Sequence, residues 1–202
     1  MISRPRHRTV RTVTLAASLL LAGAVTAPAA QAVPSGPVPS GEDGQPRHCT
    51  LDLRTGAERC YASFTEAIDH ASDGRIDDAP ASARAAAHDS RFRAQARSLA
   101  TDGDRQADGV IQGTFFDDTD FGGDSLTISG EALCEKDGWV DYQYDLQDAW
   151  KNRISSVQPW GNCWIWLYPE PGLGGDRDGP FKENTSDIGA FMNDRTQSIG
   201  FS

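Results

Sequence analysis

Residues 116–123 read FDDTDFGG, and residues 168–175 read YPEPGLGG. Both stretches begin with an aromatic residue, continue through four spacers to a second large apolar residue (Phe121 or Leu173), and end, after one spacer, on a glycine. Apolar side chains at the two ends of a glycine-containing turn can fold a hairpin back on itself, ring against backbone. The repeated pattern therefore predicts two similar folded hairpins in the C-terminal half of the chain.

A second signal follows each hairpin sequence. Residues 150–156 read WKNRISS and residues 192–198 read MNDRTQS. The two signals lie 35 residues apart in the first copy (Phe116 to Lys151) and 25 in the second (Tyr168 to Asn193). Such Asx and Ser segments offer side-chain and carbonyl oxygens at the end of a strand. Because both signals occur twice in the same order, residues 109–202 are predicted to form one all-β domain built from two copies of one unit.

Composition marks the start of this domain. Beyond Gly109 lie 14 of the 17 aromatic residues, and the helix signals end at the same point. Short β-type runs, such as 125–128 (SLTI) and 163–168 (CWIWLY), alternate with Gly, Asp and Asn turns. The domain has enough apolar material for a two-sheet sandwich, so the fold class is mainly β.

The N-terminus has the three-part build of a secretory signal peptide. Four arginines within residues 4–11 precede an apolar run at 12–24 and the small-residue sequence AQA at 30–32. Cleavage after Ala32 is expected, because the apolar run is about a dozen residues and a spanning helix needs about twenty. Residues 33–47, rich in Pro, Gly and Ser, are expected to form a disordered tether. The predicted location is therefore extracellular.

Charge and histidine placement narrow the function. Without the four leader arginines, 15 basic residues face 29 acidic ones, a net charge of −14. That charge disfavours nucleic acid and anionic membranes and favours cations and basic partners. All four histidines precede Gly109, so the β-domain holds no imidazole base for catalysis. We expect a protein that is not an enzyme and binds neither nucleic acid nor membrane.

Four cysteines in an exported chain favour two disulfides, and the sequence alone allows three pairings. We favour Cys49 with Cys60 and Cys134 with Cys163, because each pair then stays within one region. The first pair frames a Thr55-Gly56 turn, as expected for a stapled hairpin. No spacing of Cys and His typical of a zinc site is present.

Residues 48–108 are predicted to contain this hairpin followed by helices. Residues 63–66 (SFTE) have the spacing of a helix capping box. Residues 78–99 are rich in Ala and Arg and predict one or two further helices, with a break at Asp89-Ser90. Few large apolar residues occur here, so the region alone could bury only a small core. It is either an accessory domain packed on the sandwich or a removable pro-segment.

The two signals together resemble the paired Greek-key motifs of the βγ-crystallins, in the form of a single microbial secreted domain. The resemblance covers residues 110–202 and implies a two-Greek-key sandwich. Many microbial members bind two Ca²⁺ ions. Each site combines the Asx segment of one copy with the fifth-position hydroxyl of the other and with carbonyls of the aromatic turn, a donor set that suits this hard cation.

Carried over to this chain, the resemblance implies unequal sites. One site would combine Asn193, Asp194 and Ser155, all of which match the motif. The other would combine Asn152 with two departures, Lys151 in place of an Asx residue and Gln197 in place of Ser or Thr. The ammonium of Lys151 repels a cation, so one competent Ca²⁺ site and one impaired site are expected. Alternatively, both segments only form turns and bind no metal.

Three functions remain open. The first is a secreted protein that binds Ca²⁺ for extracellular stability or interaction. The second is a secreted inhibitor of metalloproteases, since a family of such inhibitors resembles the same fold. Its reactive element would be a rigid exposed loop stapled by Cys134 and Cys163. The third is an extracellular toxin or surface-interaction protein. A fold alone does not decide among these functions.

Overall fold

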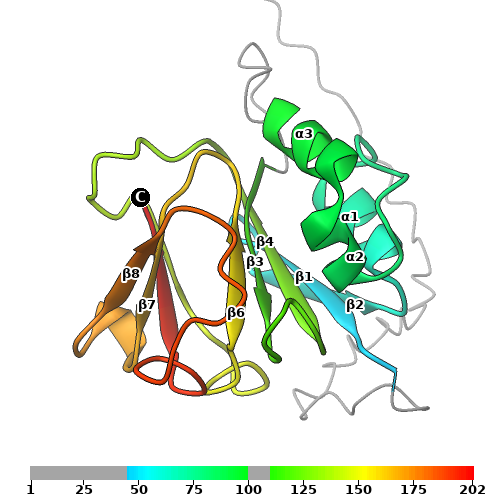
Figure 1. Ribbon diagram of the computed structural model, residues 1–202. Coiled ribbons are helices and arrows are strands. Elements are labelled where there is room, and N and C mark those ends of the chain that lie inside the picture. The colour runs from blue at the N-terminus through cyan, green and yellow to red at the C-terminus, as the bar shows by residue number, and fades with distance from the viewer. Residues whose placement is uncertain (1–44, 100–109) are drawn as a thin grey trace, which may run out of the picture. The chain divides into compact units, whose positions relative to one another are not determined.

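The computed structural model describes residues 45–99 and 110–202 (Figure 1). The signal-peptide prediction, most of the predicted tether and residues 100–109 lie outside the described residues. The elements in chain order are β1 (His48–Asp52), β2 (Ala57–Tyr61), α1 (Phe64–Ala71), α2 (Ala83–His88), α3 (Ser90–Ser98), β3 (Val110–Phe116), β4 (Ser125–Gly130), β5 (Tyr142–Asp145), β6 (Ser156–Pro159), β7 (Ile165–Tyr168), the 3-10 turn η1 (Pro171–Leu173), β8 (Asp178–Phe181) and β9 (Ser198–Phe201).

Two sheets face each other and form the predicted sandwich (Figure 1). The strand order is β2-β1-β4-β3-β6 in the first sheet and β5-β9-β7-β8 in the second. The copies exchange their third segments. Strand β5 of the first copy pairs with β9 of the second, and Thr185 of the second copy forms a bridge to Val157 on β6 of the first. This exchange interlocks two Greek keys into one domain and confirms the mainly β fold class.

The core between the sheets follows from alternation along the strands, because successive side chains of a strand point to opposite faces. Phe115 of β3 faces the second sheet and meets Phe201 of β9 with ring centroids 6.1 Å apart, edge to face. The remaining core side chains are aliphatic or aromatic residues from both sheets, among them Leu126, Ile128, Val157, Ile165, Leu167 and Ile199. Both sheets therefore depend on one shared core.

The N-terminal hairpin extends the first sheet. Strand β1 pairs antiparallel with β2 and parallel with β4, which lies some 77 positions further along the chain. Cys49 and Cys60 stand directly opposite in the hairpin register and form a disulfide, and Cys134 bonds to Cys163, so the predicted pairing is confirmed. Arg47, placed in the tether by the sequence, is joined to this sheet, because its carbonyl accepts a hydrogen bond from the amide of Ser125 at 2.9 Å.

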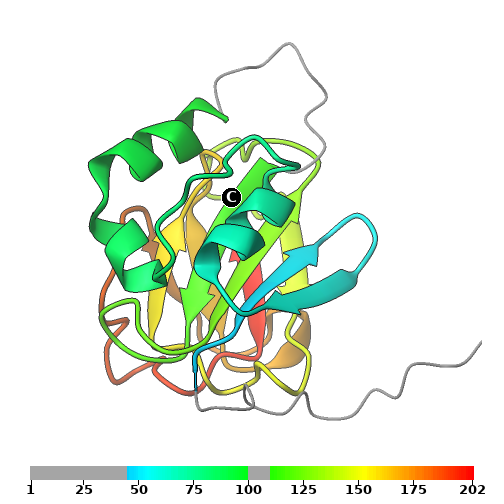
Figure 2. The ribbon, with the colours of Figure 1, turned by 90° about the vertical axis from the view of Figure 1, so that its right-hand side faces the viewer.

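Three helices cover the outer face of the first sheet (Figure 2). The Ser63 hydroxyl caps α1 by accepting from the Glu66 amide at 3.2 Å, as the capping box predicts. Asp89 separates α2 from α3 and caps the latter, since its carboxylate accepts from the Phe92 amide at 2.8 Å. The break predicted at Asp89-Ser90 is thus confirmed.

The helices build a second core on the sheet rather than a core of their own. Phe64, Ile68 and Phe92 pack with side chains from the outer face of the sandwich, including Ile111, Phe116, Phe121 and Trp160. Strand β3 is therefore buried on both faces along its whole length. This sharing explains how a region with so few large apolar residues is held in place. Whether residues 48–108 are later removed stays a prediction.

No helix within residues 45–99 and 110–202 is long and apolar enough to cross a membrane.

Candidate metal site

The two hairpins have the same backbone. In the first, Asp120, Phe121 and Gly123 have positive φ angles of 59°, 58° and 68°. In the second, the equivalent residues Gly172, Leu173 and Gly175 have φ angles of 65°, 61° and 77°. Three left-handed residues at matching positions, two of them not glycine in the first copy, fold each turn back over its own strand.

The last serine of each Asx segment holds the hairpin of its own copy. The Ser156 hydroxyl donates to the Asp118 carbonyl at 2.7 Å and accepts from the Phe121 amide at 3.1 Å. In the second copy, the Ser198 hydroxyl donates to the Glu170 carbonyl at 2.6 Å and accepts from the Leu173 amide at 3.0 Å. Residues 110–202 have the βγ-crystallin fold. Both sequence signals of each copy are thus parts of one hydrogen-bonded unit.

Known proteins of this fold are found among solved structures. A βγ-crystallin domain from Clostridium beijerinckii is 17% identical, with 45% of this chain and 95% of that chain covered and a TM-score of 0.36. A βγ-crystallin domain from Flavobacterium johnsoniae is 20% identical, with 45% of this chain and 92% of that chain covered and a TM-score of 0.34. The N-terminal domain of protein S is 22% identical, with 45% of this chain and 94% of that chain covered and a TM-score of 0.34. No protein-family model and no curated protein matches the chain.

The Asx segments of the βγ-crystallin unit cross between the copies. Asn152 and Asp194 occupy equivalent positions with φ angles of 57° and 56°. The Asp194 amide donates to the Ile154 carbonyl of the first copy at 3.1 Å, and the Asn152 amide donates to the Thr196 carbonyl of the second at 2.8 Å. Each Asx segment therefore lies beside the fourth position of the opposite copy, next to that copy's fifth-position side chain.

One crossing brings together the residues that match the motif best. Ser155 is buried, and its hydroxyl donates to the Asp117 carbonyl of the hairpin at 2.8 Å. Asp194 is exposed and Asn193 half-buried, and the Asn193 amide group donates to the Asp194 carboxylate at 2.8 Å. The donor set consists of a carboxylate, a side-chain amide, a hydroxyl and a backbone carbonyl. These hard, mostly neutral oxygens fit Ca²⁺.

The other crossing contains the departures from the motif. Asn152 is exposed, and Gln197 takes the place of a hydroxyl. The Lys151 ammonium forms an ion pair with Asp148 at 2.7 Å, but the Asp148 carboxylate is almost fully exposed, so this pair neutralises the lysine only weakly. Pro169 stands where the first copy has Asp117. A cation at this crossing would meet a positive charge and no carboxylate from the Asx pair.

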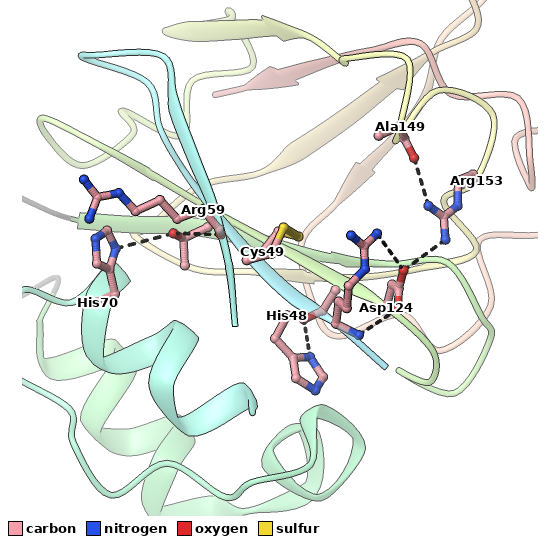
Figure 3. The surroundings of a disulfide bond; sticks show 11 residues. His48, Cys49, Arg59, His70, Asp124, Ala149 and Arg153 are labelled. Atoms are coloured by element: carbon pink, nitrogen blue, oxygen red, sulfur yellow. Dashed lines mark hydrogen bonds and ion pairs between the residues drawn. A yellow bond between two sulfur atoms is a disulfide. The ribbon is translucent and has the colours of Figure 1, made fainter. Parts of the chain in front are cut away.

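An ion-pair network beside the first hairpin was missed by the sequence reasoning. Arg153 forms an ion pair with Asp117. It also pairs with Asp124 and donates to the Ala149 carbonyl at 2.9 Å (Figure 3). Arg47 reaches Asp124 from the other side, with 3.6 Å between their charged groups. The abundance of aspartates in residues 117–124 was the available signal, but nothing in the sequence indicated which arginines would meet them.

This network sets the charge around the hairpin. Burial raises the pKa of Asp117 above its ordinary value, and the hydrogen bond from Arg153 opposes the rise. In the second copy the equivalent arginine, Arg195, donates to the Phe191 carbonyl at 2.9 Å and, among the described residues, has no carboxylate partner. The carboxylates of Asp117 and Asp124 are thus held by guanidinium groups, which leaves Asp194 as the anionic donor at the better crossing.

The described residues contain one cluster of three metal-binding side chains of the Cys, His or acidic type. It consists of Cys49, Glu58 and Cys60, and its two sulfurs form a disulfide, so they are not thiolate ligands. This cluster is not a metal site in the oxidised protein.

Proposed function

We propose that the chain is an exported, non-catalytic protein whose βγ-crystallin domain binds one Ca²⁺ ion at Asn193, Asp194 and Ser155, with the Asp117 carbonyl as a further ligand. The hydrogen bond from the Asp194 amide to the Ile154 carbonyl carries the proposal, because it fixes the Asx segment of one copy beside the hydroxyl of the other. The arginine-rich leader and the two disulfides support export. The missing imidazole in residues 110–202 supports a role without catalysis.

The ion would act as a link between the two copies. Asp194 and Asn193 belong to the second copy, while Ser155 and Asp117 belong to the first, so a bound cation ties the halves of the sandwich together. An ion that binds the folded chain and not the unfolded chain stabilises the fold by mass action, by about 2.7 kcal/mol at one hundred times the dissociation constant. A calcium-rich extracellular medium would supply that condition.

The matched positions Asp194 and Asn152 provide the test. Thermal unfolding of the full mature chain is measured with Ca²⁺ and with a chelator, for the wild type and for Asp194→Ala and Asn152→Ala. Both substitutions place alanine at nearly the same positive φ, so their costs without calcium should be similar. We expect calcium to raise Tm by several degrees in the wild type and in Asn152→Ala, and to have no effect in Asp194→Ala.

Titration calorimetry completes this test by counting the ions. One ion bound per chain, lost in Asp194→Ala, supports the proposal. Two equal sites, no binding, or a calcium effect that depends on Asn152 rather than Asp194 would contradict it.

A second function is favoured by one loop. Residues 131–141 are anchored by the Cys134–Cys163 disulfide, and the Asp141 carboxylate accepts from the Glu135 amide at 2.9 Å. At this loop the Trp139 side chain is 79% exposed. A braced loop that presents an aromatic anchor suits insertion into a protease cleft. Inhibition of a metalloprotease by the mature chain, lost in Trp139→Ala, would select this function, whereas no inhibition would dismiss it.

A further inference from the structure

A cavity of about 570 Å³ lies where the Cys134–Cys163 disulfide joins the β4–β5 loop to the start of β7. Its walls come from α3, from that loop, from the turn between β6 and β7, and from the segment after β8. Residues of both the N-terminal helical region and the βγ-crystallin domain therefore line the cavity. It shares no residue with the proposed calcium site.

Three cations line this cavity: Arg97, Lys136 and Lys182, against a single carboxylate, that of Glu183. They are far apart in a sequence whose net charge is −10, and the fold brings them to one place. Among the residues that the structure describes, no carboxylate forms an ion pair with any of the three. Uncompensated charges of one sign around a concave surface concentrate the field and attract counter-ions.

Lys182 lines the cavity and also stacks on Trp164, which does not line it. Its ammonium lies 3.7 Å from the centroid of the Trp164 ring, a cation–π contact that orients the side chain and leaves its charge unneutralised. Arg177 stands directly before β8, as Lys182 stands directly after it, and makes the equivalent contact. Its guanidinium lies 3.8 Å from the centroid of the Trp166 ring, and Arg177 does not line the cavity. The two residues therefore form a matched pair, one inside and one outside the cavity.

The floor of the cavity is rigid. Trp160 is 5% exposed, and its ring packs edge to face on Phe92 of α3 with centroids 5.8 Å apart. The next residue, Gly161, has a φ of 56°, and a Cβ there would lie 2.6 Å from the Ile111 carbonyl. Asn162 ties the turn to the loop by donating to the Cys134 carbonyl at 3.2 Å. A ligand would meet preformed walls, which lowers the entropic cost of binding.

We propose that this cavity is a binding site for a small oxyanion that carries two or more negative charges, with Arg97, Lys136 and Lys182 as its charge partners. Charge-assisted hydrogen bonds to carboxylate or phosphate oxygens are stronger than neutral ones, and three cations from three separate elements can surround such a group. Glu183, the one carboxylate of the lining, would repel anions large enough to reach it. The site goes beyond calcium binding and requires both regions of the chain.

The test uses inorganic phosphate and succinate, the simplest oxyanions of the two classes, in calcium-free buffer. Each is titrated into the ¹⁵N-labelled mature chain while the indole N–H signals of the tryptophans are followed. We expect saturable shifts for Trp160, which lines the cavity, and for Trp164, on which Lys182 stacks. We expect none for Trp150, which packs against Arg153 and does not line the cavity. The affinity should fall as salt rises, because screening weakens the charge contacts. The tighter probe identifies the class as phosphate or carboxylate.

Two variants separate a built site from general charge attraction. Lys182→Gln should weaken binding about tenfold, the loss expected for one charge-assisted hydrogen bond. Arg177→Gln removes the same unit of charge from the same sheet and should leave the affinity unchanged within twofold. Equal losses in the two variants, or no saturable shift of the Trp160 signal with either probe, would overturn the proposal.

Discussion

The two copies of the βγ-crystallin unit have hairpins with the same backbone conformation, but these hairpins lie in different surroundings. The first hairpin lies beneath the helices, where Phe121 is 3% exposed and its ring meets that of His88 at 5.8 Å. The second hairpin, with Leu173 in the equivalent place, has no helical cover in the described residues, and Gly172 at its tip is exposed. The comparison teaches that the repeated pattern determines the turn, whereas the neighbours of each turn determine what a change in it costs.

The glycines that end the hairpins should reveal this difference most strongly. A Cβ at Gly123 would lie 2.0 Å from the Asp117 carboxylate, which Arg153 holds in place, and a Cβ at Gly175 would lie 2.7 Å from the Pro169 ring. Both glycines have positive φ, so alanine adds backbone strain in each. We expect Gly123→Ala to lower the free energy of unfolding by about 3 kcal/mol and Gly175→Ala by about 2 kcal/mol.

The hairpin of the N-terminal region supplies the control for these two variants. Gly56 has a φ of 68°, and a Cβ there would meet nothing within 4 Å. Gly56→Ala should therefore report backbone strain alone, about 1 kcal/mol, in urea unfolding. Equal losses in all three variants would mean that the surroundings of the hairpins do not matter.

The sequence was informative where structure is local. The hairpins, the Asx segments, the Ser63 cap and the break at Asp89 each depend on residues within a few positions of one another, and all are found. The exchange of β5 was not predicted, because Tyr142–Asp145 gains its partner only when Ser198–Phe201 closes the second sheet. The parallel pairing of β1 with β4 was missed for the same reason, since no local pattern encodes the register between distant strands.

Charge partners were the least predictable part of the candidate site. The crossing of Asp194 to Ile154 follows from the family motif, but the meeting of Arg153 with Asp117 depends on side-chain directions that only the folded sandwich defines. The cavity cations show this most clearly. Arg97, Lys136 and Lys182 stand in three unrelated sequence contexts, and the net charge of −14 gave no sign that they would meet. In the folded chain, these three cations line one cavity.

The serines that hold the hairpins sharpen the comparison further. Ser156→Ala and Ser198→Ala each remove a hydroxyl that satisfies one carbonyl and one amide. Both serines are fully buried, but at the second hairpin Leu173 is half-buried. Water can therefore reach the Leu173 amide more readily than the Phe121 amide, so Ser198→Ala should cost about 1 kcal/mol. At the covered first hairpin, Ser156→Ala leaves the Phe121 amide without a partner and should cost about 2 kcal/mol.

Chemical denaturation at one pH measures both losses. Conversion of each serine to cysteine, which is close in size but a poorer hydrogen-bond partner, separates the loss of hydrogen bonds from the creation of a cavity. A larger loss in Ser198→Ala than in Ser156→Ala would contradict the argument from cover.

The smallest effect concerns His48, which joins the N-terminal hairpin to the covered side of the sandwich. Its imidazole is 5% exposed, its Nδ1 lies 2.8 Å from the Ser125 hydroxyl, and its ring meets that of Phe64 at 5.5 Å. Burial lowers the pKa of His48 below its ordinary value, although the nearby charge of Asp124 opposes this. Below the ordinary histidine pKa, the unfolded chain therefore binds a proton at His48 more readily than the folded chain does.

Stability should consequently be complete above the ordinary histidine pKa and fall as the pH drops below about 6.5. We expect a loss of about 1 kcal/mol by pH 5, which His48→Gln removes and which His70→Gln, a change at an exposed histidine, retains. Urea unfolding across this range gives the totals, and hydrogen exchange locates the effect. Because the side chain of His48 bonds to Ser125 of β4 and its ring meets Phe64 of α1, the amides of β1 and β4 should lose protection at pH 5 before those of β7 and β8. Equal loss of amide protection in both sheets would show that the sandwich opens as one unit. The different environments of the two copies would then change the total stability of the domain, but the two sheets would not open separately.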